Sequence, residues 1–293
     1  MTTPSNRSVR VAKLQHLLPR QALTRVAGWL AQWPGGRFTT HAIAWFVRRY
    51  RVNMAEAAQP DIRVYPTFND FFVRRLRAGM RPLADAALVS PADGVISQLG
   101  QIGSGEIIQA KGHQYSVAAL LGGCPDYPPG FEQGQFATIY LSPRDYHRVH
   151  MPCAGRLVSM THIPGQLFSV NTATAATIPG LFARNERVVC LFDSPDVGRF
   201  ALVLVGATIV GSIGTVWHGR VNTRRDGQVH HVAYGPDAPW LEQGAEMGRF
   251  ELGSTVILVF EPDRFSFDAK WQANAGIQLG QALSAHTPSR ATV

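Results

Sequence analysis

A serine preceded by glycine at a strand junction is the residue pair in this sequence best suited to unusual chemistry. Gly253-Ser254 stands between an alternating stretch, residues 249–252, and the strand-like run 255–260. Such a pair is most often only a tight turn or a bulge. A serine hydroxyl is a poor nucleophile at neutral pH, so it needs a neighbouring base, and the base needs a third group to hold its tautomer. A catalytic role for Ser254 therefore requires an imidazole and a carboxylate from elsewhere in the chain.

Two histidines and an aspartate are candidates for those partners. His147 and His150 stand three residues apart in the segment 140–152 (YLSPRDYHRVHMP), and Asp93 lies in the segment 90–95 (SPADGV). Each also has an ordinary explanation, because Pro-Ala-Asp-Gly is a common turn and two histidines at this spacing can ligate a metal. No cysteine or carboxylate cluster accompanies the histidines, so we predict no metal site. The sequence also lacks nucleophile-elbow, P-loop, dinucleotide and zinc-protease motifs, which removes the usual support for those functions.

Four segments taken together resemble the bacterial phosphatidylserine decarboxylases. They occur in the order 90–95, 140–152, 181–187 (LFARNER) and 246–254 (EMGRFELGS). Several long motifs in one order and at similar spacing are far more specific than any one of them. The resemblance runs from about Thr67 to Phe260 and, more loosely, includes the basic N-terminal segment.

The resemblance implies a self-cleaving enzyme whose cofactor comes from its own chain. In that family the matching positions form an Asp-His-Ser set, here Asp93, His150 and Ser254, and the bond that is cut becomes Gly253–Ser254. Ser254 would attack the preceding carbonyl, His150 would take its proton and Asp93 would orient the imidazole. The products would be a beta chain, residues 1–253, and an alpha chain, residues 254–293, that begins with a covalent pyruvoyl group derived from Ser254.

The same resemblance implies the reaction and the substrate. The pyruvoyl ketone would serve as the electron sink for decarboxylation of phosphatidylserine to phosphatidylethanolamine, without pyridoxal phosphate or metal. His147 matches a second histidine tied to the decarboxylation step, and we expect it to act as the acid. The residues that hold the headgroup are left open, with Lys111, Arg184 and Arg187 as candidates, and so is a homo-oligomeric state.

The N-terminal segment carries all of the excess positive charge. Residues 1–60 hold nine Lys and Arg against one acid, Glu56, and the formal net charge of the whole chain is also +8. Apolar residues recur at helical spacing in residues 23–33 and 43–50, with Pro34-Gly35-Gly36 between them. Basic amphipathic helices of this kind can lie in a membrane interface, pack on the protein's own core, or bind nucleic acid. A lipid substrate favours the first, and we predict no nucleic-acid partner.

The rest of the chain has the sequence pattern of a β protein. After a helix predicted to begin at Thr67, with Asp70 completing its cap, short apolar runs alternate with Gly, Pro, Asn and Asp from about Leu88. The predicted strands are 94–102, 136–141, 187–192, 200–205, 208–216 and 255–260. We therefore predict an α+β fold: a mostly antiparallel β catalytic domain, residues 67–293, and an N-terminal layer of basic amphipathic helices, residues 1–66.

Localisation and the alternatives follow from these features. The longest uncharged run, residues 201–217, is broken by glycines, so we predict no transmembrane helix. We expect a peripheral enzyme on the cytoplasmic side of the inner membrane, next to anionic lipid. Three scattered cysteines indicate a reducing compartment. Two other functions stay open: a pyruvoyl decarboxylase of a soluble amino acid derivative, and a non-catalytic basic module for membranes or nucleic acid in which Gly253-Ser254 is only a turn.

Overall fold

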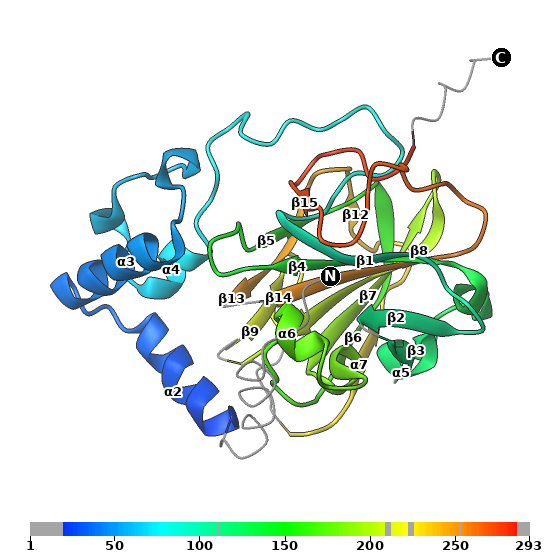
Figure 1. Ribbon diagram of the computed structural model, residues 1–293, viewed down its shortest axis with the longest axis horizontal. Coiled ribbons are helices and arrows are strands. Elements are labelled where there is room, and N and C mark those ends of the chain that lie inside the picture. Colours follow the sequence, from blue (N-terminus) through cyan, green and yellow to red (C-terminus); the bar gives the residue numbers. More distant parts are fainter. Residues whose placement is uncertain are drawn as a thin grey trace.

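A layer of helices lies beside a larger β body (Figure 1). The computed structural model describes residues 20–110, 112–122, 124–208, 212–221, 226–251 and 254–285. The helices of the layer are α2 (Arg20–Gln32), α3 (Arg37–Tyr50) and α4 (Phe68–Phe72). Two short 3₁₀ turns, Met54–Glu56 and Ile62–Val64, connect α3 to α4. Within the described residues, no helix is both long enough and apolar enough to cross a membrane.

The helical layer forms where the sequence predicts it. Thr67 and Asp70 form a reciprocal capping box at the start of α4, as expected. This helix ends at Phe72, earlier than its apolar pattern indicates, so Leu76 lies beyond it. The layer has a small core of its own, separate from those of the body, made of Ile43, Phe46, Val52, Phe71 and Phe72.

One large sheet forms the body, and all its strand pairings are antiparallel. Its order is β11-β6-β7-β8-β14-β4-β1-β15, with β12 also paired to β6. The strands are β1 (Gly94–Gln101), β4 (Gln135–Leu141), β6 (Gly155–Ile163), β7 (Arg187–Ser194), β8 (Gly198–Gly206), β11 (His230–Ala233), β12 (Trp240–Leu241), β14 (Ser254–Phe260) and β15 (Gly276–Ile277).

Smaller elements complete the body. A four-stranded sheet has the order β10-β9-β13-β5, and β2 pairs with β3 in a hairpin. These strands are β2 (Glu106–Ala110), β3 (His113–Ser116), β5 (Arg148–His150), β9 (Ser212–Thr215), β10 (Gly219–Arg220) and β13 (Glu246–Glu251). The remaining helices are α5 (Val117–Leu121), η3 (Pro129–Gln133), α6 (Thr172–Ala175) and α7 (Leu181–Arg184).

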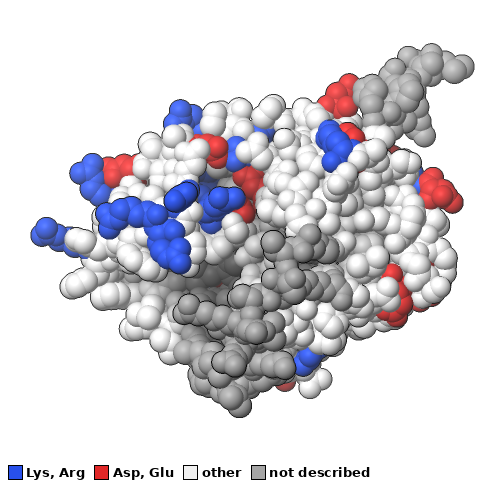
Figure 2. All heavy atoms as spheres, in the orientation of Figure 1, with Lys and Arg blue, Asp and Glu red and all other residues white. Residues whose placement is uncertain are grey.

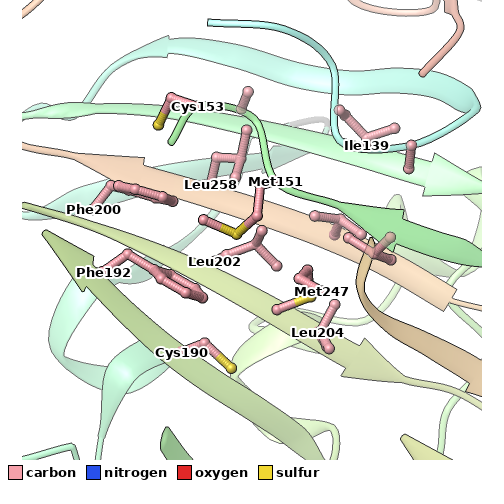
Figure 3. Packing of buried hydrophobic residues seen from close by; sticks show 14 of the residues in the cluster. Ile139, Met151, Cys153, Cys190, Phe192, Phe200, Leu202, Leu204, Met247 and Leu258 are labelled. Atoms are coloured by element: carbon pink, nitrogen blue, oxygen red, sulfur yellow. The ribbon is translucent and has the colours of Figure 1, made fainter. Parts of the chain in front are cut away.

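Strand β14 is buried on both faces because it lies in the middle of the large sheet. Its even-numbered residues from Val256 to Phe260 belong to one hydrophobic cluster, and Ile257 and Val259 belong to another. The first cluster also contains Met151 and Met247 from the segments of the smaller sheet, and Figure 3 shows them packed with Leu258 and Leu202. The second cluster is closed by the β2-β3 hairpin and by α5 and α7.

The predicted α+β class, with a mostly antiparallel body and N-terminal helices, is confirmed. Five of the six predicted strands match β1, β4, β7, β8 and β14 closely. The sixth, 208–216, shortens to β9, and residues 209–211 lie outside the described residues. The prediction missed β6, whose apolar residues are interrupted by Ser159, Thr161 and His162. The three cysteines are free and buried. The division into domains at residue 66 stays a prediction.

Candidate active site

Ser254 is the first residue of β14, at the end of the strand that meets the smaller sheet. It is fully buried, between Leu141 of β4 and Gly206 of β8 in the register of the sheet. Its hydroxyl has no hydrogen-bond partner among the described residues. A buried polar group left in this state is costly, so the position calls for a functional explanation. Gly253, the other half of the predicted cleavage bond, lies outside the described residues.

The side chain of Ser254 faces the smaller sheet. Side chains alternate along a strand, so Ser254 shares a face with Val256, whose cluster includes Leu141 and Val149. Val149 belongs to β5, which carries His150 and follows His147 directly. The chain leaves β4 at Leu141, opposite Ser254, and reaches both histidines within a few residues. The sheet register therefore brings Val149 of the histidine segment to the face on which Ser254 opens, and by the same alternation the side chain of His150 projects from the other face of β5.

His150 is held as a neutral base by its hydrogen bonds. Its Nδ1 lies 2.8 Å from the carbonyl oxygen of Gly244, so this nitrogen carries the hydrogen. Its Nε2 lies 3.2 Å from the hydroxyl of Tyr146, which donates to it. Burial lowers the pKa of His150, which leaves the ring neutral at pH 7 with Nε2 as its basic atom.

Asp93 has partners other than the expected imidazole. Its carboxylate accepts two hydrogen bonds from Arg81 Nε, at 2.9 and 3.1 Å, and one from Arg81 Nη2 at 2.6 Å. Its Oδ1 also accepts a bond from the backbone N–H of Leu279 at 2.9 Å. Arg81 in turn binds Glu56 at 2.7 Å. Asp93 still acts on His150 through its charge, which works against the lowering of the pKa of that histidine. Gly244 thus fixes the tautomer of His150, and Asp93 contributes an electrostatic field.

His147 is the more deeply buried of the two histidines. Its Nδ1 donates to the carbonyl of Asp145 at 2.8 Å, and its ring lies 4.1 Å from that of Phe72. Its Nε2 has no hydrogen-bond partner in the described part of the chain. Burial lowers the pKa of His147 to about 3. The backbone N–H of Phe250 donates to the carbonyl of His147 at 3.0 Å, which ties this histidine to the strand leading into Ser254.

Comparisons with known proteins agree with this arrangement. The family model described as Phosphatidylserine decarboxylase matches residues 68–285, and a second, described as PSD, matches residues 11–51. A phosphatidylserine decarboxylase proenzyme of Acidovorax ebreus (strain TPSY) is 60% identical, over 94% of this chain and 98% of the relative. The chain belongs to the phosphatidylserine decarboxylase family. Proteins of the same name from Methylibium petroleiphilum (57% identical; 92% and 95% covered) and Chromobacterium violaceum (56%; 92% and 96%) are also similar.

Membership in the phosphatidylserine decarboxylase family confirms the resemblance and the class of enzyme, a decarboxylase made as a proenzyme. The roles of Asp93, His147, His150 and Ser254 stay predictions. The structure brings the histidine segment close to the end of β14 that holds Ser254, but among the described residues no hydrogen bond joins Asp93 to His150 or His150 to Ser254.

Sequence reasoning missed three partners in this decarboxylase site. Tyr146 lies inside the quoted histidine motif, but nothing in the motif indicates that its hydroxyl binds His150. Gly244 acts through its backbone carbonyl, for which side-chain types carry no signal. Arg81 comes from an irregular segment without periodicity, so its pairing with Asp93 depends on the tertiary fold alone.

Proposed function

We propose that this chain cleaves itself between Gly253 and Ser254, and that the processed enzyme decarboxylates phosphatidylserine to phosphatidylethanolamine. The observation that carries the proposal is the buried, unpartnered hydroxyl of Ser254 at the start of β14. The hydroxyls of Ser159 and Thr255 are also buried without a partner among the described residues. Ser254 differs from them in following Gly253 directly and in sharing a face of the sheet with Val149 of the histidine segment. The family supports the reaction class, and the names of the similar proteins support the substrate.

Cleavage begins with the Ser254 hydroxyl. Its oxygen attacks the carbonyl carbon of Gly253, His150 Nε2 takes the hydroxyl proton once the Tyr146 hydroxyl has released that nitrogen, and the amide becomes an ester. Loss of the Ser254 α-proton then breaks the bond from Cβ to the ester oxygen, releasing the carboxylate of Gly253 and leaving dehydroalanine. Hydrolysis of dehydroalanine gives ammonia and the ketone of the pyruvoyl group. The negative charge of Asp93 stabilises His150 while its ring holds the proton.

The position of Ser254 fits a pyruvoyl group. The side chain of Ser254 is buried and, among the described residues, makes no hydrogen bond that cleavage would break. It lies on the face of the sheet that packs against Val149 of the histidine segment. The group supplies a ketone that takes the substrate amine and accepts the electron pair as carbon dioxide leaves. The alpha chain stays in place after cleavage, because β14 is paired along its whole length with β4 and β8.

His147 handles a proton in the decarboxylation step. With Nδ1 donating to Asp145 and a pKa near 3, its Nε2 is a bare acceptor at pH 7. His147 therefore has to accept a proton at Nε2 before it can return one to the carbon that loses carbon dioxide. The ring of Phe72 packs against His147, and His147 is fully buried, so water is kept from Nε2.

The helical layer is the membrane-facing part of the enzyme in this proposal. Its outer surface exposes Trp29 (67%) and Phe38 (76%), together with Trp45. Trp33, Phe38 and their neighbours also line an apolar groove of about 470 Å³ between α2, α3 and α4. Figure 2 shows Lys and Arg side chains gathered over the helical layer. Exposed aromatic groups beside cations suit the interface of an anionic membrane, and we place the enzyme peripherally on the cytoplasmic side of the inner membrane.

A single pair of variants tests the proposed function. Ser254→Ala should remain one 32.0 kDa chain and release no carbon dioxide from carboxyl-labelled phosphatidylserine. Thr255→Val is the matched control, because Thr255 is also buried and its hydroxyl is also unpartnered, on the opposite face of β14. It should cleave and decarboxylate like the wild type. Cleavage of Ser254→Ala at the same bond would contradict the mechanism, and activity on serine derivatives but not on the lipid would favour the soluble-substrate alternative.

A further inference from the structure

Two buried arginines, Arg187 of the body and Arg74 just after α4, differ in how their donors are used. Arg187 makes four hydrogen bonds to backbone carbonyls, those of Ala119, Leu120, Ala183 and Asn185, at 2.6 to 2.9 Å. This arginine, one of the headgroup candidates from the sequence, is therefore occupied in the fold. Arg74 is equally buried, at 5% exposed, but makes one long side-chain bond, from Nη2 to the carbonyl of Arg144 at 3.3 Å. Its Nε and Nη1 have no partner among the described residues.

The unused donors of Arg74 are a cost to the fold. A guanidinium keeps its charge in proteins and presents its donors in a rigid plane. Burying that charge without a partner is unfavourable, and here burial lowers the pKa of Arg74. The ring of Phe71 lies 5.3 Å from its Cζ and compensates only in part. An external anion is the partner that would satisfy this group.

Arg74 lines a cavity of about 340 Å³ with room for such an anion. The acids in the same wall already have partners. Arg81 binds both Asp93 and Glu56, and Asp145 accepts hydrogen bonds from the backbone and hydroxyl of Ser142, each at 2.7 Å. Arg74 is therefore left as a buried cation facing a polar space, without a carboxylate hydrogen-bonded to it.

The cavity adjoins both histidines of the candidate site. Asp145, in its wall, binds His147 Nδ1 through its carbonyl. Tyr146, also in its wall, donates to His150 Nε2. The charge of Arg74 itself acts on His147, where it adds to the lowering of the pKa. An anion held by Arg74 would thus lie next to the groups that handle protons in the reaction.

We propose that Arg74 is a substrate-binding residue that holds the phosphodiester of the lipid headgroup. This inference rests on the proposed function, since it assumes a phospholipid substrate. The substrate offers two anions, a carboxylate and a phosphodiester. An arginine bound to the carboxylate would stabilise the ground state against loss of carbon dioxide. The phosphodiester keeps its charge throughout, and its oxygens can accept a hydrogen bond from Nε or Nη1 of Arg74, the free donors on two different edges of the guanidinium plane.

The first test compares Arg74→Met with Arg199→Met in the processed enzyme. Arg199 is the matched control, because it loses the same charge from a solvent-exposed pair with Asp193. Losing a charge-assisted hydrogen bond should raise KM for phosphatidylserine in mixed micelles about tenfold in Arg74→Met, and Arg199→Met should match the wild type. An unchanged KM for a self-cleaved Arg74→Met enzyme overturns the proposal.

Arg74→Lys keeps the comparison usable if Arg74→Met fails to fold or to cleave. Lysine retains the charge but loses the planar pair of donors, so KM should still rise, by less than in the methionine variant. A KM equal to that of the wild type would again overturn the proposal. Failure of the wild type itself to cleave or to decarboxylate the lipid would instead refute the proposed function.

A second test separates the two anions of the headgroup. Glycerophosphoethanolamine has the phosphodiester and no carboxylate, whereas free serine has the carboxylate and no phosphate. Inhibition of phosphatidylserine decarboxylation by glycerophosphoethanolamine should weaken about tenfold in the Arg74 variant, and any inhibition by serine should not change. Selective loss of the inhibition by serine would assign Arg74 to the carboxylate and overturn the proposal.

Discussion

The β body buries its apolar side chains more completely than the helical layer does. The body encloses β14 between two extensive hydrophobic clusters, one on each face of the large sheet. The layer has a core of five residues and leaves several large aromatic side chains in solvent. Burial on both faces fixes the geometry of β14 within the sheet. A layer with an apolar outer surface remains open to a further partner.

The two regions meet next to the candidate site. Arg81 joins Glu56 of the connecting segment to Asp93 of the body. Phe72, from the core of the layer, packs against His147 with the two rings tilted by 44°, and the carbonyl of Val73 accepts a hydrogen bond from Arg148 Nε at 2.8 Å. The geometry of the site therefore depends on how the helical layer packs against the body.

The largest effect is expected from a cavity in the body. Leu258→Ala removes a fully buried side chain from the middle of β14. It should lower the free energy of unfolding by about 2–5 kcal/mol. Leu30→Ala, an exposed position in the layer, should change it by less than about 0.5 kcal/mol. Urea unfolding of both variants in the uncleaved Ser254→Ala chain would measure the contrast, and equal losses would remove the distinction between the two regions.

The second-largest loss of unfolding free energy is expected from removing Arg81, which joins the layer to the body through its ion pairs with Glu56 and Asp93. Arg81→Met leaves Asp93 buried without its guanidinium, which should cost about 3 kcal/mol of unfolding free energy. The exposed pair of Arg199 and Asp193 offers a control, since Arg199→Met should cost less than about 1 kcal/mol. The measurement is again urea unfolding in the Ser254→Ala chain. A loss for Arg81→Met as small as for Arg199→Met would show that the joint contributes little.

Acid should weaken the body through its buried histidines. The pKa of His147 is about 3 in the folded protein, against 6.5 as its ordinary value. Between these two pH values the unfolded chain binds more protons, so the free energy of unfolding should fall as pH falls, by up to about 1.4 kcal/mol per unit. Stability curves at several pH values should be flatter for His147→Gln, and unchanged for His41→Gln in the exposed face of α3. If the free energy of unfolding varied with pH equally in His147→Gln and in the wild type, the lowered pKa of His147 would be contradicted.

The outer surface of the layer should give the mildest effect on the fold and a selective effect on membranes. Trp29→Ser with Phe38→Ser should weaken binding to anionic vesicles at least several-fold, because both side chains are exposed and apolar. Ile108→Ser with Trp240→Ser removes exposed apolar groups from the body and serves as the control. Co-sedimentation with the vesicles measures binding. Equal binding by both double variants and the wild type would refute the membrane role of the layer.

The central strands and the ends of the first helices could be predicted from the sequence because their signals are local. Runs rich in Val, Ile, Leu and Phe, bounded by glycine, proline or polar residues, mark β7, β8 and β14. The capping box at Thr67 needs only four residues. Strand β6 could not be found in this way, because its polar Ser159 and Thr161 are buried by neighbouring strands and break the pattern expected of a strand.

The candidate site was predictable in its residues but not in its contacts. Long motifs pointed to Asp93, His147, His150 and Ser254, and the sheet register explains how the histidines approach the serine. The partners of Asp93 and His150 come from Arg81, Gly244 and Tyr146. All three lie in irregular segments, where side-chain periodicity gives no information about what lies nearby.

The mass of the purified wild-type protein tests the central claim most directly. The account predicts two chains, with the smaller one matching residues 254–293 minus one ammonia, as expected for a pyruvoyl group in place of an N-terminal serine. That chain should also react with a hydrazide that labels ketones. A single intact chain that nevertheless decarboxylates phosphatidylserine would contradict the account, and so would a small chain that begins with an ordinary serine.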